Sequence, residues 1–102
     1  MTAEARVEQG DNGRVLVGGE LSFSSVPRFW RDLCASFPDG ERVDIDLSRV
    51  QRADSAGLAL LVECLRQAQA AGREVRFFNI PPQMLEMARV SGLDAVLPLA
   101  HD

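Results

Sequence analysis

The segment from Arg42 to Ala71 limits most strongly what this chain can fold into. Its first part, Val43–Leu47, alternates apolar and acidic residues, as a strand with one buried face does. Its last part carries leucines at intervals of three and four residues, which is typical of an amphipathic helix. A short polar turn, Arg52–Gly57, separates the two parts. We therefore predict a strand, a turn and a long helix whose inward positions are Leu58, Leu60, Leu61, Val62, Cys64, Leu65 and Ala68.

The residues that follow extend this unit toward the C-terminus. Gly72 is placed to end the long helix, and Glu74–Phe78 predicts a second strand. A strand, a helix and a strand in this order give parallel strands joined by a right-handed crossover. Pro81 and Pro82 open a third helix that Gly92 closes. Five of its positions are expected to face inward: Met84, Leu85, Met87, Ala88 and Val90.

The two ends of the chain predict simpler structures. Residues 3–9 alternate weakly and residues 14–18 are rich in β-branched side chains, so both segments are expected to be strands. Between them, residues 10–13 contain Asn and Gly, which tolerate positive φ, and we predict a hairpin. Residues 19–21 are expected to leave the second strand. Residues 96–99 are predicted to be a short apolar segment, and residues 100–102 are predicted to be a frayed end.

A further helix is predicted to begin after Ser24 and Ser25. A serine hydroxyl can accept a free N–H of the first turn, and Pro27 lacks an N–H where none is needed. Apolar residues then recur at three- and four-residue intervals, in a stripe formed by Val26, Phe29, Trp30, Leu33 and Phe37. Phe29 and Trp30 are predicted to lie in the core. If one of them faces solvent, it is a candidate secondary interface, which self-association could use.

Length and composition describe one soluble domain. The 102 residues suffice for a single hydrophobic core, with 46% hydrophobic and 25% charged residues. The net charge of -4 leads us to expect no nucleic-acid partner. We find no signal pattern and no apolar run of membrane-spanning length, so we expect a cytoplasmic protein. Cys34 and Cys64 have no further ligand at metal-binding spacing, and buried free thiols are favoured over a disulfide.

The polar turn before the long helix is the strongest candidate for function. Asp54 and Ser55 stand where the first-turn N–H groups lack partners, and either side chain can cap the helix. The same position presents the Ser55 hydroxyl at a helix N-terminus, which suits a phosphate or a docked partner. The chain has no Lys, and its one histidine, His101, is second from the end, so no base is available to activate Ser55. We therefore predict no enzyme activity, no metal and no cofactor.

The segment Asp46–Leu61 resembles the signature region of the STAS domain, the fold of anti-sigma factor antagonists. The likeness extends to Gly19–Leu21, to Phe29 and Trp30, and to Val96–Pro98. Together these features are most similar to the small STAS subunits of bacterial Mla phospholipid-transport ABC complexes, the MlaB-like group. The resemblance covers nearly the whole chain, as a single STAS domain over residues 1–102. It implies an α/β fold, a mixed β-sheet with an N-terminal hairpin and helices packed on one side.

Two alternative functions follow from this resemblance. As an Mla-type subunit, the protein would bind the cytoplasmic ATPase of an ABC transporter that also contains a permease. That complex moves phospholipid and maintains outer-membrane lipid asymmetry; the subunit would be peripheral at the inner membrane, without inserting into it. As an anti-sigma factor antagonist, the protein would be switched by phosphorylation of Ser55. Such antagonists usually carry a second hydroxyl residue and a further glycine where this chain has Ala56 and Ala59, which favours the transporter function. The implied partner-binding residues are Arg52, Asp54, Ser55, Ala56 and Gly57.

Overall fold

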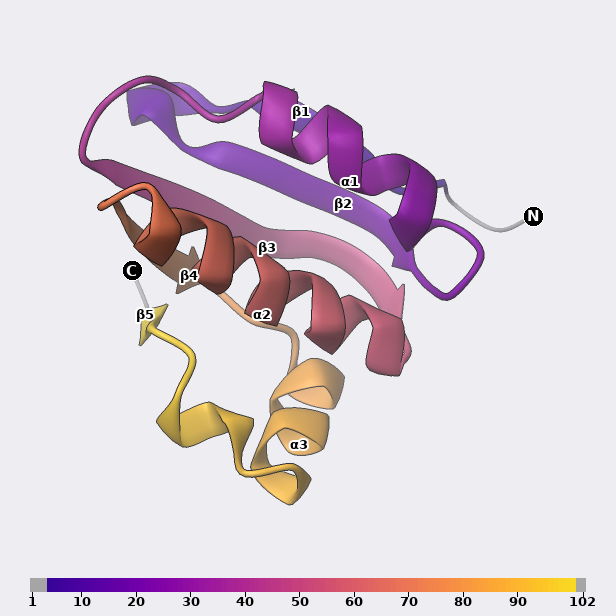
Figure 1. Ribbon diagram of the computed structural model, residues 1–102. Coiled ribbons are helices and arrows are strands. Elements are labelled where there is room, and N and C mark those ends of the chain that lie inside the picture. The colour runs from indigo at the N-terminus through magenta and orange to yellow at the C-terminus, as the bar shows by residue number, and fades with distance from the viewer. Residues whose placement is uncertain (1–3, 101–102) are drawn as a thin grey trace.

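The computed structural model describes residues 4–100, in which one sheet holds the strands in chain order (Figure 1). The strands are β1 (Arg6–Gln9), β2 (Val15–Leu21), β3 (Arg42–Ala53), β4 (Glu74–Phe78) and β5 (Leu99–Ala100). The helices are α1 (Val26–Ala35), α2 (Ser55–Ala70) and α3 (Pro82–Val90), with short 3-10 turns at Asp11–Gly13 and Leu93–Ala95.

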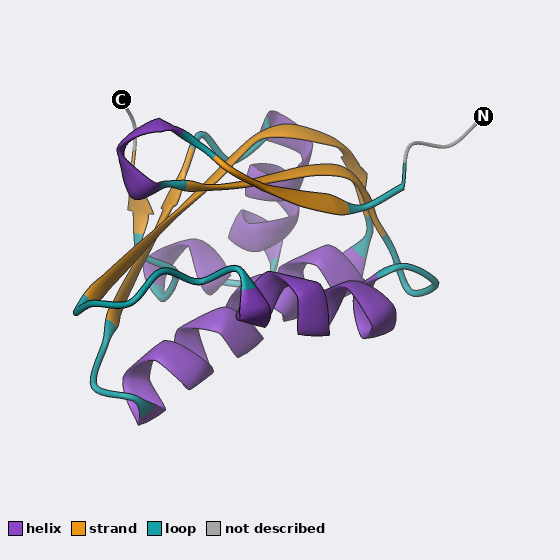
Figure 2. Ribbon diagram, turned by 90° about the horizontal axis from the view of Figure 1, so that it is seen from above, coloured by secondary structure: helices purple, strands orange, loops and turns teal. Residues whose placement is uncertain are grey.

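Both predicted supersecondary units are present in the sheet. β1 pairs with β2 in antiparallel orientation, which confirms the N-terminal hairpin. β3 runs parallel to both β2 and β4, and α2 connects β3 to β4. Figures 1 and 2 show α1 and α2 together on one side of the sheet. The chain therefore has the predicted α/β architecture, a mixed sheet with an N-terminal hairpin and helices packed on one side.

The hydrophobic core lies between the sheet and these helices. α1 contributes Phe29 and Leu33, which confirms its apolar stripe. Along α2 the predicted inward positions are buried except Val62 and Leu65, which are partly buried. The largest fully buried side chains come from every layer of the fold: Phe77, Leu21, Leu33, Ile45, Leu47, Leu61, Met84, Val15, Val17, Val43 and Cys64.

The end of α2 was predicted correctly. Gly72 adopts a left-handed conformation with φ of +68° directly after the last helical turn. The N–H of Arg73 donates to the carbonyl of Ala68 at 2.7 Å, and the N–H of Gly72 donates to Gln69 at 3.1 Å. These two bonds satisfy carbonyls that a helix end otherwise leaves without partners.

Two strands are longer than predicted, and this shortens the turn before α2. β2 continues through Leu21, which pairs with Ala53 at the end of β3. The alternation fails as a guide here because the β2–β3 pairing shifts register twice, so that two exposed residues follow each other at Ser48 and Arg49. Only Asp54 therefore lies between β3 and α2.

Several smaller predictions about the helices and the C-terminal end were wrong. Val90 was expected to face inward, yet it is 88% exposed because α3 ends there. Ser25 precedes α1 but its side chain does not cap that helix. Ala100, predicted to belong to the frayed end, instead forms β5 with Leu99 and pairs with β4. His101 lies outside the described residues.

Candidate protein-binding surface at the start of the long helix

Asp54 joins the start of α2 to the loop that follows β2. Its Oδ1 accepts a hydrogen bond from the N–H of Ala56 at 2.8 Å, which caps the helix. Its Oδ2 accepts from the N–H of Phe23 at 3.2 Å, and its own N–H donates to the carbonyl of Leu21 at 3.0 Å. One carboxylate thus fixes the position of two neighbouring segments. The capping role predicted for this residue is confirmed.

The loop Ser22–Ser25 is held by serine hydroxyls as well as by Asp54. The Ser25 hydroxyl donates to the carbonyl of Glu20 at 2.8 Å and accepts from the N–H of Ser22 at 2.9 Å. The hydroxyls of Ser22 and Ser24 lie 2.9 Å apart. These bonds order the loop while the side chain of Phe23 remains 71% exposed.

Ser55, the first residue of α2, is exposed beside this loop. Within residues 4–100 its hydroxyl has no hydrogen-bonding partner, because the capping role belongs to Asp54. Arg52, at the end of β3, is also exposed. A free hydroxyl at a helix N-terminus is suited to contact with another protein or to phosphorylation by one.

Two of the predicted contact residues are buried. Ala56 is 8% exposed and Gly57 is buried. A Cβ atom on Gly57 would lie 3.0 Å from the Cβ of Ala53 and 3.2 Å from that of Leu21. Gly57 therefore permits the close approach of α2 to the sheet. Of the other predicted contact residues, Arg52 and Ser55 are exposed and Asp54 is partly buried.

A polar cleft opens beside the loop, between β2 and α1. Its volume is about 400 Å³, and Ser22, Ser24 and Ser25 form part of its wall. The charged side chains that line it are Glu4, Glu20, Asp32 and Arg28. Three carboxylates against one guanidinium give this side of the surface an acidic character.

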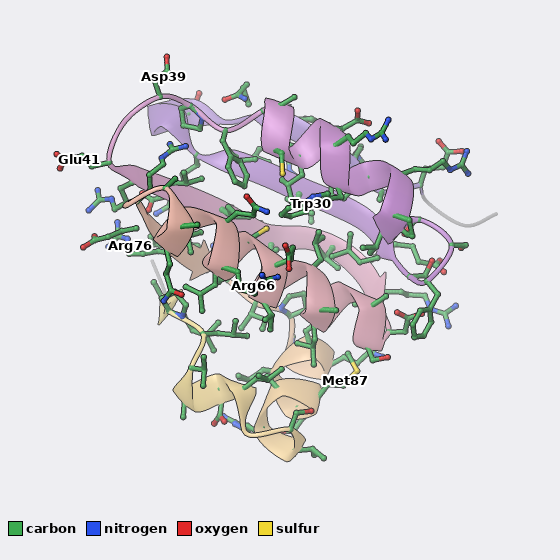
Figure 3. The ribbon with its side chains drawn as sticks, in the orientation of Figure 1. Trp30, Asp39, Glu41, Arg66, Arg76 and Met87 are labelled. Carbon is green, nitrogen blue, oxygen red and sulfur yellow. The ribbon has the colours of Figure 1, made fainter. Side chains whose placement is uncertain are left out.

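Neither Phe29 nor Trp30, the two residues of the candidate secondary interface, has an exposed side chain. Phe29 is 4% exposed and belongs to the core, as the first alternative expected. Trp30 is partly buried and packs against the core from the side of α1 that faces α2 (Figure 3). In the same view Met87 extends from α3 toward the N-terminal part of α2.

The pKa values of both cysteine thiols are raised above the ordinary value. Cys34 is partly buried, Cys64 is buried, and both are free. Burial raises the pKa of Cys64, with smaller contributions from Cys34 and from the charge of Glu63. Burial and then Glu63 raise the pKa of Cys34. Among residues 4–100, no three His, Cys, Asp or Glu side chains lie together as a metal site requires.

Comparison with known proteins places this geometry in a family. A family model described as the MlaB STAS domain matches residues 5–99. The chain belongs to the MlaB-type STAS domain family. The intermembrane phospholipid transport system binding protein MlaB of Haemophilus influenzae is 36% identical over 90 residues. The match spans 84% of this chain and 86% of that protein.

Solved structures of other STAS proteins share the fold. The anti-sigma factor antagonist SpoIIAA in its unphosphorylated form gives a TM-score of 0.70 at 17% identity, covering 96% of this chain and 87% of its own. A STAS domain protein from Planctomyces limnophilus gives 0.72 at 19% identity, covering 98% and 91%. At these identities the STAS fold is what the structures have in common with this chain.

Sequence reasoning missed one residue of this STAS surface. Phe23 is the aromatic side chain most exposed to solvent among residues 4–100. Its signal in the sequence is a single aromatic residue among the serines of Ser22–Ser25. The hydrogen bond that holds it beside Ser55 joins residues 31 positions apart, and local patterns do not contain such information.

Proposed function

We propose that this protein is a non-catalytic STAS subunit that binds the cytoplasmic ATPase of an Mla-type ABC transporter. In this role it supports the phospholipid transport that maintains outer-membrane lipid asymmetry, and it sits at the inner membrane only through its partner. The observation that carries the proposal is the 36% identity to the MlaB protein of Haemophilus influenzae over most of both chains. In the part of the chain that the structure describes, no helix is long and apolar enough to cross a bilayer.

The geometry at the start of α2 supports a binding role. The Ser55 hydroxyl is exposed, Asp54 is already engaged as a cap, and Arg52 adds an exposed charge at the strand end. These groups stand on rigid elements, so a partner would meet a surface that needs little rearrangement.

The test is complex formation with the ABC ATPase encoded in the same genome. Co-purification of tagged wild-type protein should recover a stoichiometric complex. Ser55→Asp and Ser55→Arg should each weaken binding at least about tenfold, because bulk and charge enter a packed contact. Gln69→Glu adds one negative charge at the other, exposed end of the same helix and should bind as wild type. Far-UV circular dichroism must show that all variants fold; failure of the wild type to bind would refute the proposal.

A second candidate function is a phosphorylation switch of the anti-sigma antagonist kind. The observation in its favour is the exposed Ser55 hydroxyl at a helix N-terminus. Phosphorylation would add a charge of about -1.5 to -2 there, which the helix dipole favours and the neighbouring Asp54 opposes. Mass spectrometry of the protein from its native host decides between the candidates. Phosphoserine at position 55 would favour the switch, and an unmodified residue in a complex with an ATPase would favour the transporter.

A further inference from the structure

Phe23 is an exposed aromatic side chain in the loop Ser22–Ser25. It is 71% exposed, whereas the other aromatic residues of the described chain are buried or partly buried. A large apolar group in water is unfavourable for a free protein, and aromatic residues are enriched among the side chains that dominate binding energy at interfaces. This exposure suggests that the side chain is buried when a partner is bound.

The backbone around Phe23 is fixed before any partner arrives. Its N–H donates to Asp54 Oδ2 at 3.2 Å, and the Ser25 hydroxyl ties the next residues of the loop to Glu20 and Ser22. The cost of ordering a flexible loop on binding is therefore small, which favours affinity. Because Asp54 also caps α2, Phe23 and Ser55 belong to one rigid surface.

The charges beside Phe23 indicate the chemistry of the partner. The cleft next to the loop is lined by Glu4, Glu20 and Asp32 against Arg28. The whole chain carries a net charge of -4. An anionic lipid surface would be repelled by this field, whereas a protein with basic side chains would be attracted.

We propose that Phe23 is the apolar anchor of the partner interface. It inserts into an apolar socket on the ATPase, and basic side chains at the rim of that socket face the acidic cleft. This inference rests on the proposed function and adds to it an apolar anchor residue and the character of the surface that receives it.

The experiment measures the dissociation constant for the ATPase by isothermal titration calorimetry at low and at physiological salt. Phe23→Ala should weaken binding about 30-fold, and Phe23→Leu should restore part of the loss because it retains apolar volume. Val90→Ala is the matched control, since Val90 is an apolar side chain 88% exposed on α3. It should bind as wild type, and wild-type binding should weaken as salt screens the acidic cleft.

The outcomes separate this inference from the function on which it rests. A wild-type protein that does not bind the ATPase overturns the proposed function. A different result would be that wild type binds the ATPase, Ser55→Asp binds more weakly, and Phe23→Ala binds as wild type. This result would refute the role of Phe23 as an anchor and leave the proposed function standing. Sedimentation with vesicles of equal parts phosphatidylethanolamine and phosphatidylglycerol tests the membrane alternative. Vesicle binding that requires Phe23, with ATPase binding unchanged in Phe23→Ala, would also overturn the inference.

Discussion

Two surfaces of this protein differ in whether their aromatic and polar side chains have partners: the outer face of the sheet, which points away from α1 and α2, and the surface at the start of α2. On the face of the sheet away from α1 and α2, the aromatic residue Phe78 is covered by arginines. The guanidinium carbon of Arg14 lies 3.8 Å from the centre of its ring and that of Arg76 lies 5.0 Å away. Arg76 also bonds both carboxylate oxygens of Asp44, and Arg14 pairs with Asp46 at 3.5 Å.

At the start of α2, by contrast, an aromatic side chain and a hydroxyl group have no partners within the described chain. Phe23 is exposed, and no residue between 4 and 100 bonds the Ser55 hydroxyl. The polar groups that are satisfied there, such as the Asp54 carboxylate, hold backbone in place. A surface that satisfies its own groups contributes to stability, whereas one that leaves apolar and hydroxyl groups uncovered is available for binding. This contrast predicts which substitutions change stability and which change affinity.

The largest effect should come from the outer face of the sheet. Phe78→Ala removes a side chain that is 4% exposed, together with its cation–π contacts to two guanidinium groups. We expect a loss of about 3 kcal/mol in the free energy of unfolding, from the lost burial and the cavity left behind. Urea denaturation measures it. The folded Phe78→Ala protein should bind the ATPase as wild type does. Reduced affinity of the folded variant would show that the outer face of the sheet also contributes to binding.

A smaller loss is expected beneath the binding surface. Gly57→Val places methyl groups where a Cβ alone would already lie 3.0 Å from Ala53. Overpacking of this kind costs about 2 kcal/mol and should tilt α2 away from the sheet, so both stability and affinity should fall. Ala59→Val, at an exposed position of the same helix, is the control and should change stability by less than about 1 kcal/mol.

Asp54→Asn tests the two roles of Asp54, which caps α2 and holds the backbone of Phe23. Asparagine has one side-chain oxygen, so it can accept from Ala56 or from Phe23 but not serve both as the carboxylate does. We expect thermal denaturation to show a loss of about 1 kcal/mol. The variant should remain folded, and its affinity for the ATPase should still fall because the backbone of Phe23 is no longer held in place. Equal affinity of this variant and wild type would show that the loop needs no anchor.

The smallest effect should come from a single ion pair of the outer face. Arg76→Gln removes the bonds to Asp44, but the Arg76 side chain is 40% exposed and its pair is screened by water. We expect a change of at most about 1 kcal/mol in unfolding free energy and none in affinity. A large loss of stability, measured by denaturation at low salt, would mean that the paired charges act as a network.

The sequence was most informative where one periodicity runs without interruption. Val43–Leu47 alternates strictly, and the strand it predicted is present in β3. The extension of β3 to Ala53 was missed because the register shifts against β2 break the alternation, and such shifts depend on a distant strand. Val90 has helical spacing from Met87, but it falls at the last residue of α3, where no neighbouring element covers it.

The candidate site was predictable in part for the same reason. Asp54 as a cap depends on adjacent residues, and local sequence chemistry was sufficient to predict it. Ala56 and Gly57 were assigned to the polar turn, but α2 begins at Ser55 and both residues are buried in its first turn, Gly57 close to Leu21 and Ala53. The exposure of Phe23 depends on a loop held from a residue 31 positions away, which no local pattern contains.

The connection of one residue between β3 and α2 has a mechanical consequence. Because Asp54 alone joins the central strand to the helix that begins at Ser55, the link has no slack to absorb a displacement. A force that a partner applied at Ser55 would reach β3, the middle strand of the sheet, through this single residue. The proposed binding surface is therefore joined to the core without a flexible linker, and in a complex this protein would resist deformation at Ser55.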